Sequence, residues 1–277
     1  MANTNLVALK GYFENDAVKK NLRAMLGTKA QGFATSVLSV VNNNKLLQKA
    51  EPASIYSSAM VAASLDLPIN PNLGFAAIVP YGSQAQCQIM AKGFIQLAIR
   101  SGQYAKINNA IVHEGELVSY DPFKDEYLFD ASKRKSDNVI GYMAYIRLTS
   151  GYEKYFYMTK EECLAHGKRY SKTFNNGTWK DNPDAMCLKT VIKLLLSKYG
   201  ILSTEMQRAI KFDQAVVKGD FSQMESVEEI DGAEVEYIDN PQNSFSKEKA
   251  QAVAEKFAGF AEAEEVKDQG DNPNENQ

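Results

Sequence analysis

LDLPINPNLGFAAIVPYGSQAQCQIMAKGFIQLAIRSGQY, residues 65–104, contains the change of hydrophobic period that decides the fold. An apolar run at residues 75–79 is followed by residues 84–89, in which every second residue is a glutamine. The turn formers Gly82 and Ser83 lie between the two runs. The pattern therefore predicts a β-hairpin with one polar, glutamine-lined face, and the return to helical spacing predicts a helix over residues 91–101.

Helical and strand patterns continue on both sides of this stretch. Apolar residues three and four positions apart predict helices at residues 12–26, 31–41, 52–66, 159–170 and 183–199. Residues 104–158 have strand patterns, which end in a hairpin formed by 140–148 and 152–158. We expect an α+β fold with a helical N-terminal segment, a β-hairpin, an antiparallel sheet packed with helices, and a disordered acidic C-terminal tail.

The net charge of −3 is unevenly distributed along the chain. Residues 1–212 contain 26 Lys and Arg against 17 Asp and Glu, a net charge of +9, whereas residues 213–277 contain 5 against 17, a net charge of −12. A basic body is typical of a protein with a polyanionic partner, and a solvated face beside an acidic tail is the alternative. We expect a core over residues 1–212 and an acidic linker over 213–277, with one short helix at 246–262.

Several classes of protein do not fit the sequence. No apolar run approaches the ~20 residues of a membrane helix, so we expect a soluble, cytoplasmic protein without membrane contact. Three scattered cysteines argue against disulfides, and Cys163 with His166 alone does not make a zinc site, so no metal is expected. The G-x-x-x-x-G-K-[ST] phosphate loop is absent, as is an acid-x-Lys nuclease triplet within residues 1–212. We expect no enzyme activity, no catalytic residue and no cofactor, and His113, beside Glu114, fits a structural histidine better than a catalytic one.

Two of the predicted helices carry a polar line without an acid. Spacing of four residues places Lys92, Gln96 and Arg100 on one face of the first helix. The same spacing places Lys189 and Lys193 on one face of the second, and the other faces of both helices are mainly apolar. Such close cations repel one another unless something anionic lies opposite, and a phosphate-binding groove would supply it. Plain amphipathic packing is the alternative, and Lys198, which lies off the line, fits a cation at a helix end.

Aromatic residues are interleaved with cations between residues 142 and 180. For each tyrosine in this segment, packing in a strand core is a better interpretation than base stacking, because strands favour tyrosine. Trp179 is the better candidate for stacking, worth roughly 1–3 kcal/mol per base, because it lies in a polar loop beside a lysine. The cations expected to contact nucleic acid near these aromatic residues are Lys106, Arg147, Lys154 and Lys180.

At these residues the sequence resembles a known family. The stretch at 65–104 resembles the signature region of the RecT family of prophage recombinases, which are related more distantly to the beta protein of the lambda Red system. WKDNPDAMCLKTVIKLLLSKYGILS, residues 179–203, resembles the late helix of the same family. With the order of predicted elements, the resemblance extends over residues 12–212.

The resemblance implies ATP-independent annealing of complementary strands in phage-type homologous recombination. It implies a core that binds single-stranded DNA and the annealed duplex and that assembles into rings or helical filaments. Lys189 matches the groove lysine of the late helix and Trp179 a nearby aromatic position, while Lys92, Gln96 and Arg100 match the signature helix. The alternative is a single-strand binder that protects DNA without annealing it.

The acidic tail has its own expected role. We expect residues 1–212 to suffice for annealing and the tail to dock a partner, either a phage exonuclease or the host single-strand-binding protein. Phe257 and Phe260 are the expected apolar anchors. A solubilising tail without a partner is the alternative.

Overall fold

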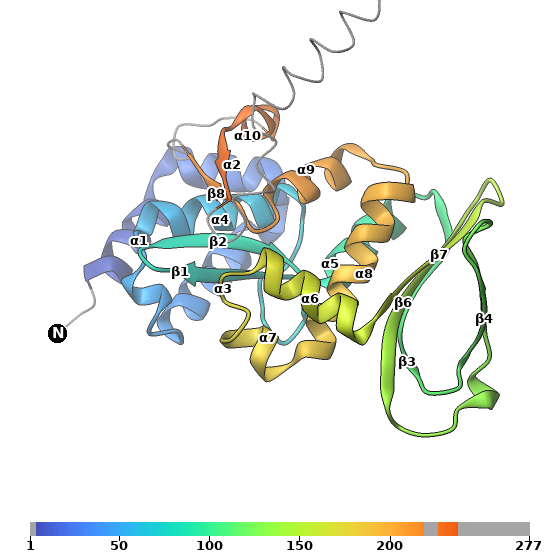
Figure 1. Cartoon of the computed structure of the whole chain (residues 1–277). Helices are drawn as coiled ribbons and strands as arrows, with labels where there is room; N and C mark the ends of the chain where they lie inside the picture. The colour runs from blue at the N-terminus through green and yellow to red at the C-terminus, as the bar shows by residue number, and fades with distance from the viewer. Residues whose placement is uncertain (1–3, 219–226, 238–277) are drawn as a thin grey trace, which may run out of the picture. The chain divides into compact units, whose positions relative to one another are not determined.

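The computed structural model describes residues 4–218 and 227–237, which belong to one compact unit, Met1–Asn240. Its elements, labelled in Figure 1, are the helices and strands α1 (Thr4–Glu14), α2 (Asp16–Leu26), α3 (Ala30–Asn42), α4 (Pro52–Ser64), β1 (Ala76–Tyr81), β2 (Gln84–Ile89), α5 (Ala91–Arg100), β3 (Tyr104–His113), β4 (Leu117–Asp121), β5 (Glu126–Phe129), β6 (Val139–Leu148), β7 (Glu153–Thr159), α6 (Lys160–Tyr170), α7 (Gly177–Asp181), α8 (Pro183–Tyr199), α9 (Thr204–Phe212), β8 (Val216–Val217), α10 (Val227–Gly232) and β9 (Val235–Glu236). The predicted α+β class is confirmed. The expected helix at 246–262 and residues 238–277 of the expected tail lie outside the described residues, whereas residues 213–218 and 227–237 of that tail are described.

Helix α4 is the centre of the N-terminal helical part. All ten residues 54–63 are buried, and α1 and α2 pack against the helix. Pro52 occupies its first turn, where a missing backbone N–H costs nothing. The single helix predicted over 12–26 is wrong, because the chain breaks at Asn15, whose side chain accepts a 2.9 Å hydrogen bond from Ala17 N and so caps α2.

The predicted hairpin is formed by β1 and β2, which pair antiparallel from Ala76 with Ile89 to Tyr81 with Gln84. Gly82 has φ +63°, the left-handed conformation that a two-residue hairpin turn needs. The expected polar face is not solvent-exposed, since Gln86 is 0% and Gln88 8% exposed. Both faces of β2 are therefore packed.

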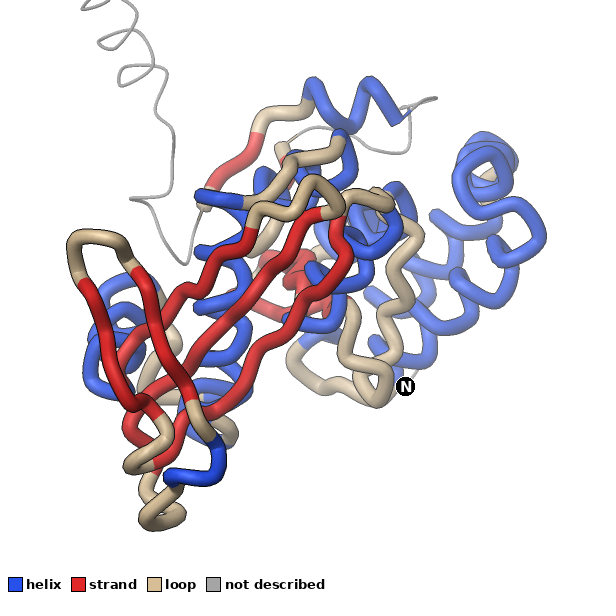
Figure 2. The backbone as a smooth tube through the Cα atoms, turned by 90° about the vertical axis from the view of Figure 1, so that its right-hand side faces the viewer, coloured by secondary structure: helices blue, strands red, loops and turns tan. Residues whose placement is uncertain are grey.

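A three-stranded antiparallel sheet of order β3, β6, β7 forms the other half of the unit. Helices α6 and α8 pack against one face of this sheet. The hairpin of β4 and β5 lies over the other face, where Tyr127 packs on Tyr157 and Phe129 on Tyr155. Figure 2 shows the strands of this sheet and of the β4–β5 hairpin nearest the viewer, with helices behind them.

Helix α8 has the bounds that the sequence predicts, because Asn182 caps it by accepting from Ala185 N and Pro183 starts it. Residues beyond 212 continue the compact unit: Ile230 is 0% and Ala233 8% exposed. The domain boundary expected at residue 212 stays a prediction, for which a truncation test is given below. Within the described part of the chain, no helix has both the length and the apolar character needed to span a membrane.

Candidate nucleic-acid interface

Trp179 lies in α7, not in an open loop as the sequence suggests. The side chain is buried, with 8% exposed, and its ring centroid is 5.5 Å from that of Phe174. A Cβ at Gly167 would lie 2.6 Å from Trp179 Cη2, so only glycine lets the indole lie this close to α6. The tryptophan is thus fixed in place, with little of its surface free.

A groove of about 290 Å³ lies beside Trp179. Its polar and apolar lining comes from the β1–β2 hairpin, the loop after α3, the segment from α6 to α8 and the residues after α9. It consists of Asn44, Leu46, Val79, Pro80, Tyr81, Gln88, Ser171, Thr173, Asn176, Gly177, Thr178, Trp179, Met186 and Gln214. A pocket of about 60 Å³ shares four of these residues and adds His166, Tyr170 and Lys189. We call the two together the Trp179 groove. Its amides and hydroxyls can both donate and accept hydrogen bonds.

Three exposed lysines are placed by sequence next to residues that line the Trp179 groove. Lys180 follows Trp179, Lys45 lies between Asn44 and Leu46, and Lys172 lies between Ser171 and Thr173. Only Lys180 was expected from the sequence. The other two lie in loops, where no periodic pattern distinguishes them from any surface lysine.

The lysines predicted on α8 face a carboxylate of the chain itself. Asp213, which is 1% exposed, lies 3.2 Å from Lys189 Nζ and 2.5 Å from Lys193 Nζ. Its Oδ1 also accepts a 2.9 Å hydrogen bond from Ile89 N in β2. The anion that the sequence required opposite this line is therefore present within the protein, and Lys189 itself is only 3% exposed.

The two neighbouring lysines keep the Asp213 carboxyl in its charged form. Burial raises the pKa of the Asp213 carboxyl, but Lys189 and Lys193 outweigh it and hold that pKa below its ordinary value. Burial lowers the pKa of Lys189. Burial also lowers the pKa of His166, helped by Lys193 and Arg169, so the imidazole that lines the groove is neutral near pH 7 and can both donate and accept.

The line predicted on α5 is only partly as expected. Lys92 and Arg100 are exposed and Gln96 is half-buried, while Arg100 Nη2 donates to Asp66 O at 3.3 Å. Ile99, on an apolar face of the helix, is 54% exposed, because the helix packs through Phe94 and Leu97.

The remaining predicted cations lie on or near the three-stranded sheet. Lys106 on β3 is opposite Arg147 on β6, and Arg147 is 3.6 Å from Glu153. Lys154 forms an ion pair with Asp125. The Nζ atoms of Lys154 and Lys198 each lie 4.9 Å from the Tyr199 ring centroid. The structure thus brings Trp179 and Lys189 together in one groove and places the sheet cations elsewhere.

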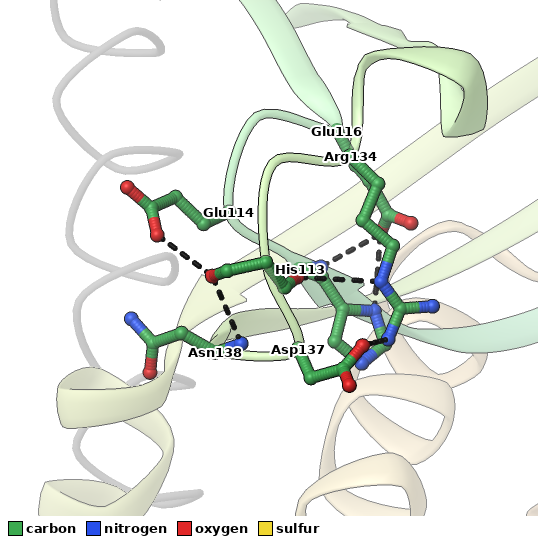
Figure 3. Close-up of polar contacts among 7 residues, drawn as sticks. His113, Glu114, Glu116, Arg134, Asp137 and Asn138 are labelled. Carbon is green, nitrogen blue, oxygen red and sulfur yellow. Dashed lines mark hydrogen bonds and ion pairs between the residues drawn. The ribbon is translucent and has the colours of Figure 1, made fainter.

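His113 belongs to a polar cluster at the end of β3 (Figure 3). Its backbone N–H donates to Glu116 at 2.7 Å and its ring Nδ1 is 3.3 Å from the same carboxylate. Arg134 Nη2 donates to Asp137 at 2.7 Å. The loop before β6 is joined to the end of β3 by Ser136 Oγ, which donates to Glu114 at 2.8 Å, and by Glu114 N, which donates to Asn138 O at 2.9 Å. Among the residues with described positions, no group of three or more His, Cys, Asp or Glu could hold a metal ion.

The α+β fold, the polar groove and its neighbouring lysines are features of a nucleic-acid-binding protein. The sequence matches the RecT family over residues 31–231, and the chain therefore belongs to the RecT family. It is 50% identical over 202 residues to the "Uncharacterized protein YqaK" of Bacillus subtilis (strain 168), covering 73% of this chain and 70% of that protein. It is 29% identical over 203 residues to "Protein RecT" of Escherichia coli (strain K12), covering 66% of this chain and 75% of that protein.

The resemblance inferred from residues 65–104 and 179–203 is thereby confirmed. Membership of this family implies single-strand annealing in DNA recombination, binding of single-stranded DNA and oligomerisation.

A spectroscopic prediction follows from the position of Trp179, the one tryptophan of the chain. Oligothymidine in the groove should contact the exposed edge of the indole or displace water from it, and so shift or quench its emission. Titration of the full-length chain with oligothymidine measures this change. An unchanged emission spectrum at saturation would place the DNA away from Trp179.

Proposed function

We propose that this protein anneals complementary DNA strands without ATP, holding one strand in the Trp179 groove. The observation that carries the proposal is the lining of this groove by neutral hydrogen-bonding side chains and by the aromatic residues Tyr81, Tyr170 and Trp179, with Lys189 in the lining and further lysines adjacent in sequence. Phosphates near lysines and bases near amides and an aromatic ring are how proteins hold single strands without reading their sequence.

Independence of ATP rests on the sequence. The chain lacks the G-x-x-x-x-G-K-[ST] loop whose backbone N–H groups hold the phosphates of ATP. Annealing releases free energy by itself through base pairing, so a protein only has to hold strands in a geometry that leaves bases accessible. We propose that no nucleotide is hydrolysed and that no cofactor takes part.

Protection of single strands without annealing is the alternative function, and one assay separates the two. Two complementary oligonucleotides with donor and acceptor dyes are mixed with the full-length chain, without nucleotide, and energy transfer is followed over time. We expect pairing faster than the spontaneous rate. A rate equal to or below the spontaneous one, with both strands bound, would favour protection.

The lysines beside the groove give a residue-level test of the same proposal. Lys45→Ala, Lys172→Ala and Lys180→Ala should each reduce the slope of log affinity against log salt by about 0.7, the value for one phosphate contact on a single strand. Lys10→Ala, an exposed lysine on α1, is the matched control and should leave the slope unchanged. Equal slopes for all four variants and the parent would remove the groove from the proposal.

Further contacts stay predictions that the same salt titration can test. We propose that DNA also contacts the neutral residue Gln96 and other cations predicted from the sequence. These cations are Lys92, Arg100, Lys106, Arg147, Lys154, Lys193 and Lys198. We also propose that the tail beyond Asn240 docks a phage exonuclease or the host single-strand-binding protein. The place of action would be the bacterial cytoplasm, where DNA recombines.

A further inference from the structure

The hairpin of β4 and β5 presents an apolar tip. Phe123 in its turn is 99% exposed, and Asp121 Oδ1 accepts from the backbone N–H of Phe123 at 2.9 Å and of Lys124 at 3.2 Å. These two bonds fix the turn. A phenylalanine held outward at a structured tip exposes an aromatic surface that water disfavours and that a pocket could bury.

The inner face of the same hairpin is occupied. Tyr120 stacks on Tyr127 at 4.4 Å between ring centroids, and Tyr127 stacks on Phe129 at 5.9 Å. Through Tyr127 and Phe129 this aromatic row packs on the sheet strand β7. The hairpin is therefore held in place by its packing on β7, and the Phe123 side chain at its tip faces away from that sheet.

A pocket of about 430 Å³ lies among the N-terminal helices. Its lining combines an apolar floor with two cations and no acid among the described residues, and consists of Phe13, Lys19, Leu22, Arg23, Gly27, Thr28, Ala30, Gln31 and Ala34. The floor residues Phe13 and Leu22 are 7% and 2% exposed. An aromatic ring placed there would bury apolar surface on both sides.

The charges of the tip and the pocket are opposite. Residues 121–126 contain three acids, of which Asp125 pairs with Lys154, and one lysine. Residues 16–31 contain one acid, Asp16, and four basic side chains, of which Lys29 pairs with Asp66. Lys19 is 3.5 Å from Asp16, and Arg23 is the cation of the pocket that forms no ion pair with another residue of described position. Opposite potentials on two surfaces steer association and fix its register.

The tip cannot reach the pocket of its own chain. Within the compact unit, helices α1 to α3 lie at one end and β4 at the other (Figure 1). We infer that Phe123 of one copy inserts into the pocket between α2 and α3 of a second copy, with the acidic tip against Arg23.

Such a contact joins two different surfaces, so each copy can bind one neighbour at its tip and another at its pocket. Head-to-tail contacts of this kind produce rings when the rotation closes and helical filaments when it does not. One aromatic anchor covers a small part of the roughly 1,200–2,000 Å² of a stable interface, so we expect weak association that strengthens when several copies share one strand. The inference goes beyond strand annealing and does not depend on it.

Sedimentation velocity of the full-length chain, with and without long oligothymidine, tests the contact. Phe123→Ala should weaken self-association about 30-fold, the loss expected for an interface anchor worth about 2 kcal/mol. Tyr152→Ala, which removes an aromatic side chain that is 45% exposed in the neighbouring β6–β7 turn, is the matched control and should associate like the parent. Because Phe123 is so exposed, its variant should keep the parent's circular dichroism and melting temperature. Parent-like association of Phe123→Ala would overturn the inference.

A mixing experiment tests the polarity of the contact. The pocket variant Arg23→Glu/Gln31→Glu changes two exposed residues and should also fail to assemble. Mixed with Phe123→Ala it should form one-to-one dimers that grow no further, because one intact tip then meets one intact pocket. A mixture no more associated than its two components would contradict the inference.

A photo-crosslinking residue at position 123 identifies directly what the tip contacts. Phe123→p-benzoylphenylalanine should crosslink under light to residues 13–34 of another copy, as mapped by mass spectrometry. Crosslinks to the 241–277 segment or to DNA instead would overturn the inference, since the tip would then meet the tail or the strand. Short-oligonucleotide binding and annealing, measured on the same variants, show separately whether the proposed DNA function holds.

Discussion

Asp213→Ala should lower the free energy of unfolding by about 3–5 kcal/mol, because it leaves two neighbouring lysines in low-dielectric surroundings without their anion. Lys189 is almost fully buried and both ammonium groups lie within 3.2 Å of the lost carboxylate. The substitution also removes the acceptor of Ile89 N, which would then be a buried donor without a partner in this part of the structure. Urea denaturation of the full-length chain measures the loss.

A double variant distinguishes the charge effect from the packing effect. Asp213→Leu/Lys189→Met replaces the more buried pair with apolar side chains, and we expect it to be closer to the parent in stability than Asp213→Ala. Equal losses in both variants would show that shape and hydrogen bonding, not the uncompensated charge, dominate.

The same carboxylate predicts a direction for the pH dependence. Since the folded pKa of Asp213 is lowered, its contribution is complete above the unfolded value of about 4 and is lost as pH falls through the lower folded value. The difference in stability between the parent and Asp213→Asn should therefore shrink in that acidic range. A difference that grows on acidification would contradict the ion cluster.

Two truncated chains, one ending at Phe212 and one at Asn240, should differ in stability by more than any single substitution changes it. A chain ending at Phe212 loses Asp213 and also Asp231, whose carboxylate pairs with Arg208 through contacts of 2.5 and 2.6 Å. The buried Asp213 cluster alone is worth about 3–5 kcal/mol, and the Arg208–Asp231 pair, whose carboxylate is partly exposed, adds a smaller amount. Their joint loss is a large share of the whole stability of a domain, about 5–15 kcal/mol. We expect this chain to be largely unfolded, whereas a chain ending at Asn240 should fold and bind DNA.

Thermal melting, limited proteolysis and oligothymidine binding compare the two chains. If the shorter chain melts and binds like the parent, the boundary predicted at residue 212 is right and the contacts of residues 213–237 are dispensable. If the longer chain fails to fold, residues 241–277 contribute to the fold, and the tail is not a separate docking segment.

Sequence patterns predicted those structural features that depend only on residues close together in the chain. The turn at Gly82 and the cap at Asn182 lie next to the elements that they define, so the first hairpin and helix α8 were predicted closely. Asp213 shows the limit of this approach. Its charge was counted with the acidic tail, although it lies 24 residues after Lys189 in sequence and 3.2 Å from it in space.

The site was predicted in part for the same reason. Trp179 and Lys189 do line one groove, but the burial of Trp179 depends on Gly167, which no periodic pattern connects with it. The lysines at 45 and 172 come close to the groove only through the fold. The family resemblance could indicate which helices matter, but the pairing of their charges required the tertiary contacts.

The two edges of the β1–β2 hairpin are protected against pairing with strands of other molecules. Gln214 N donates to Cys87 O at 2.9 Å and Ala215 bridges Cys87, so the outer edge of β2 is already covered by the chain that follows Asp213. The other strand, β1, contains Pro80, which has no N–H to offer a passing strand. Both edges of this hairpin are thus protected against pairing with a strand of another molecule, and Asp213 supports that protection as well as the charge balance of α8.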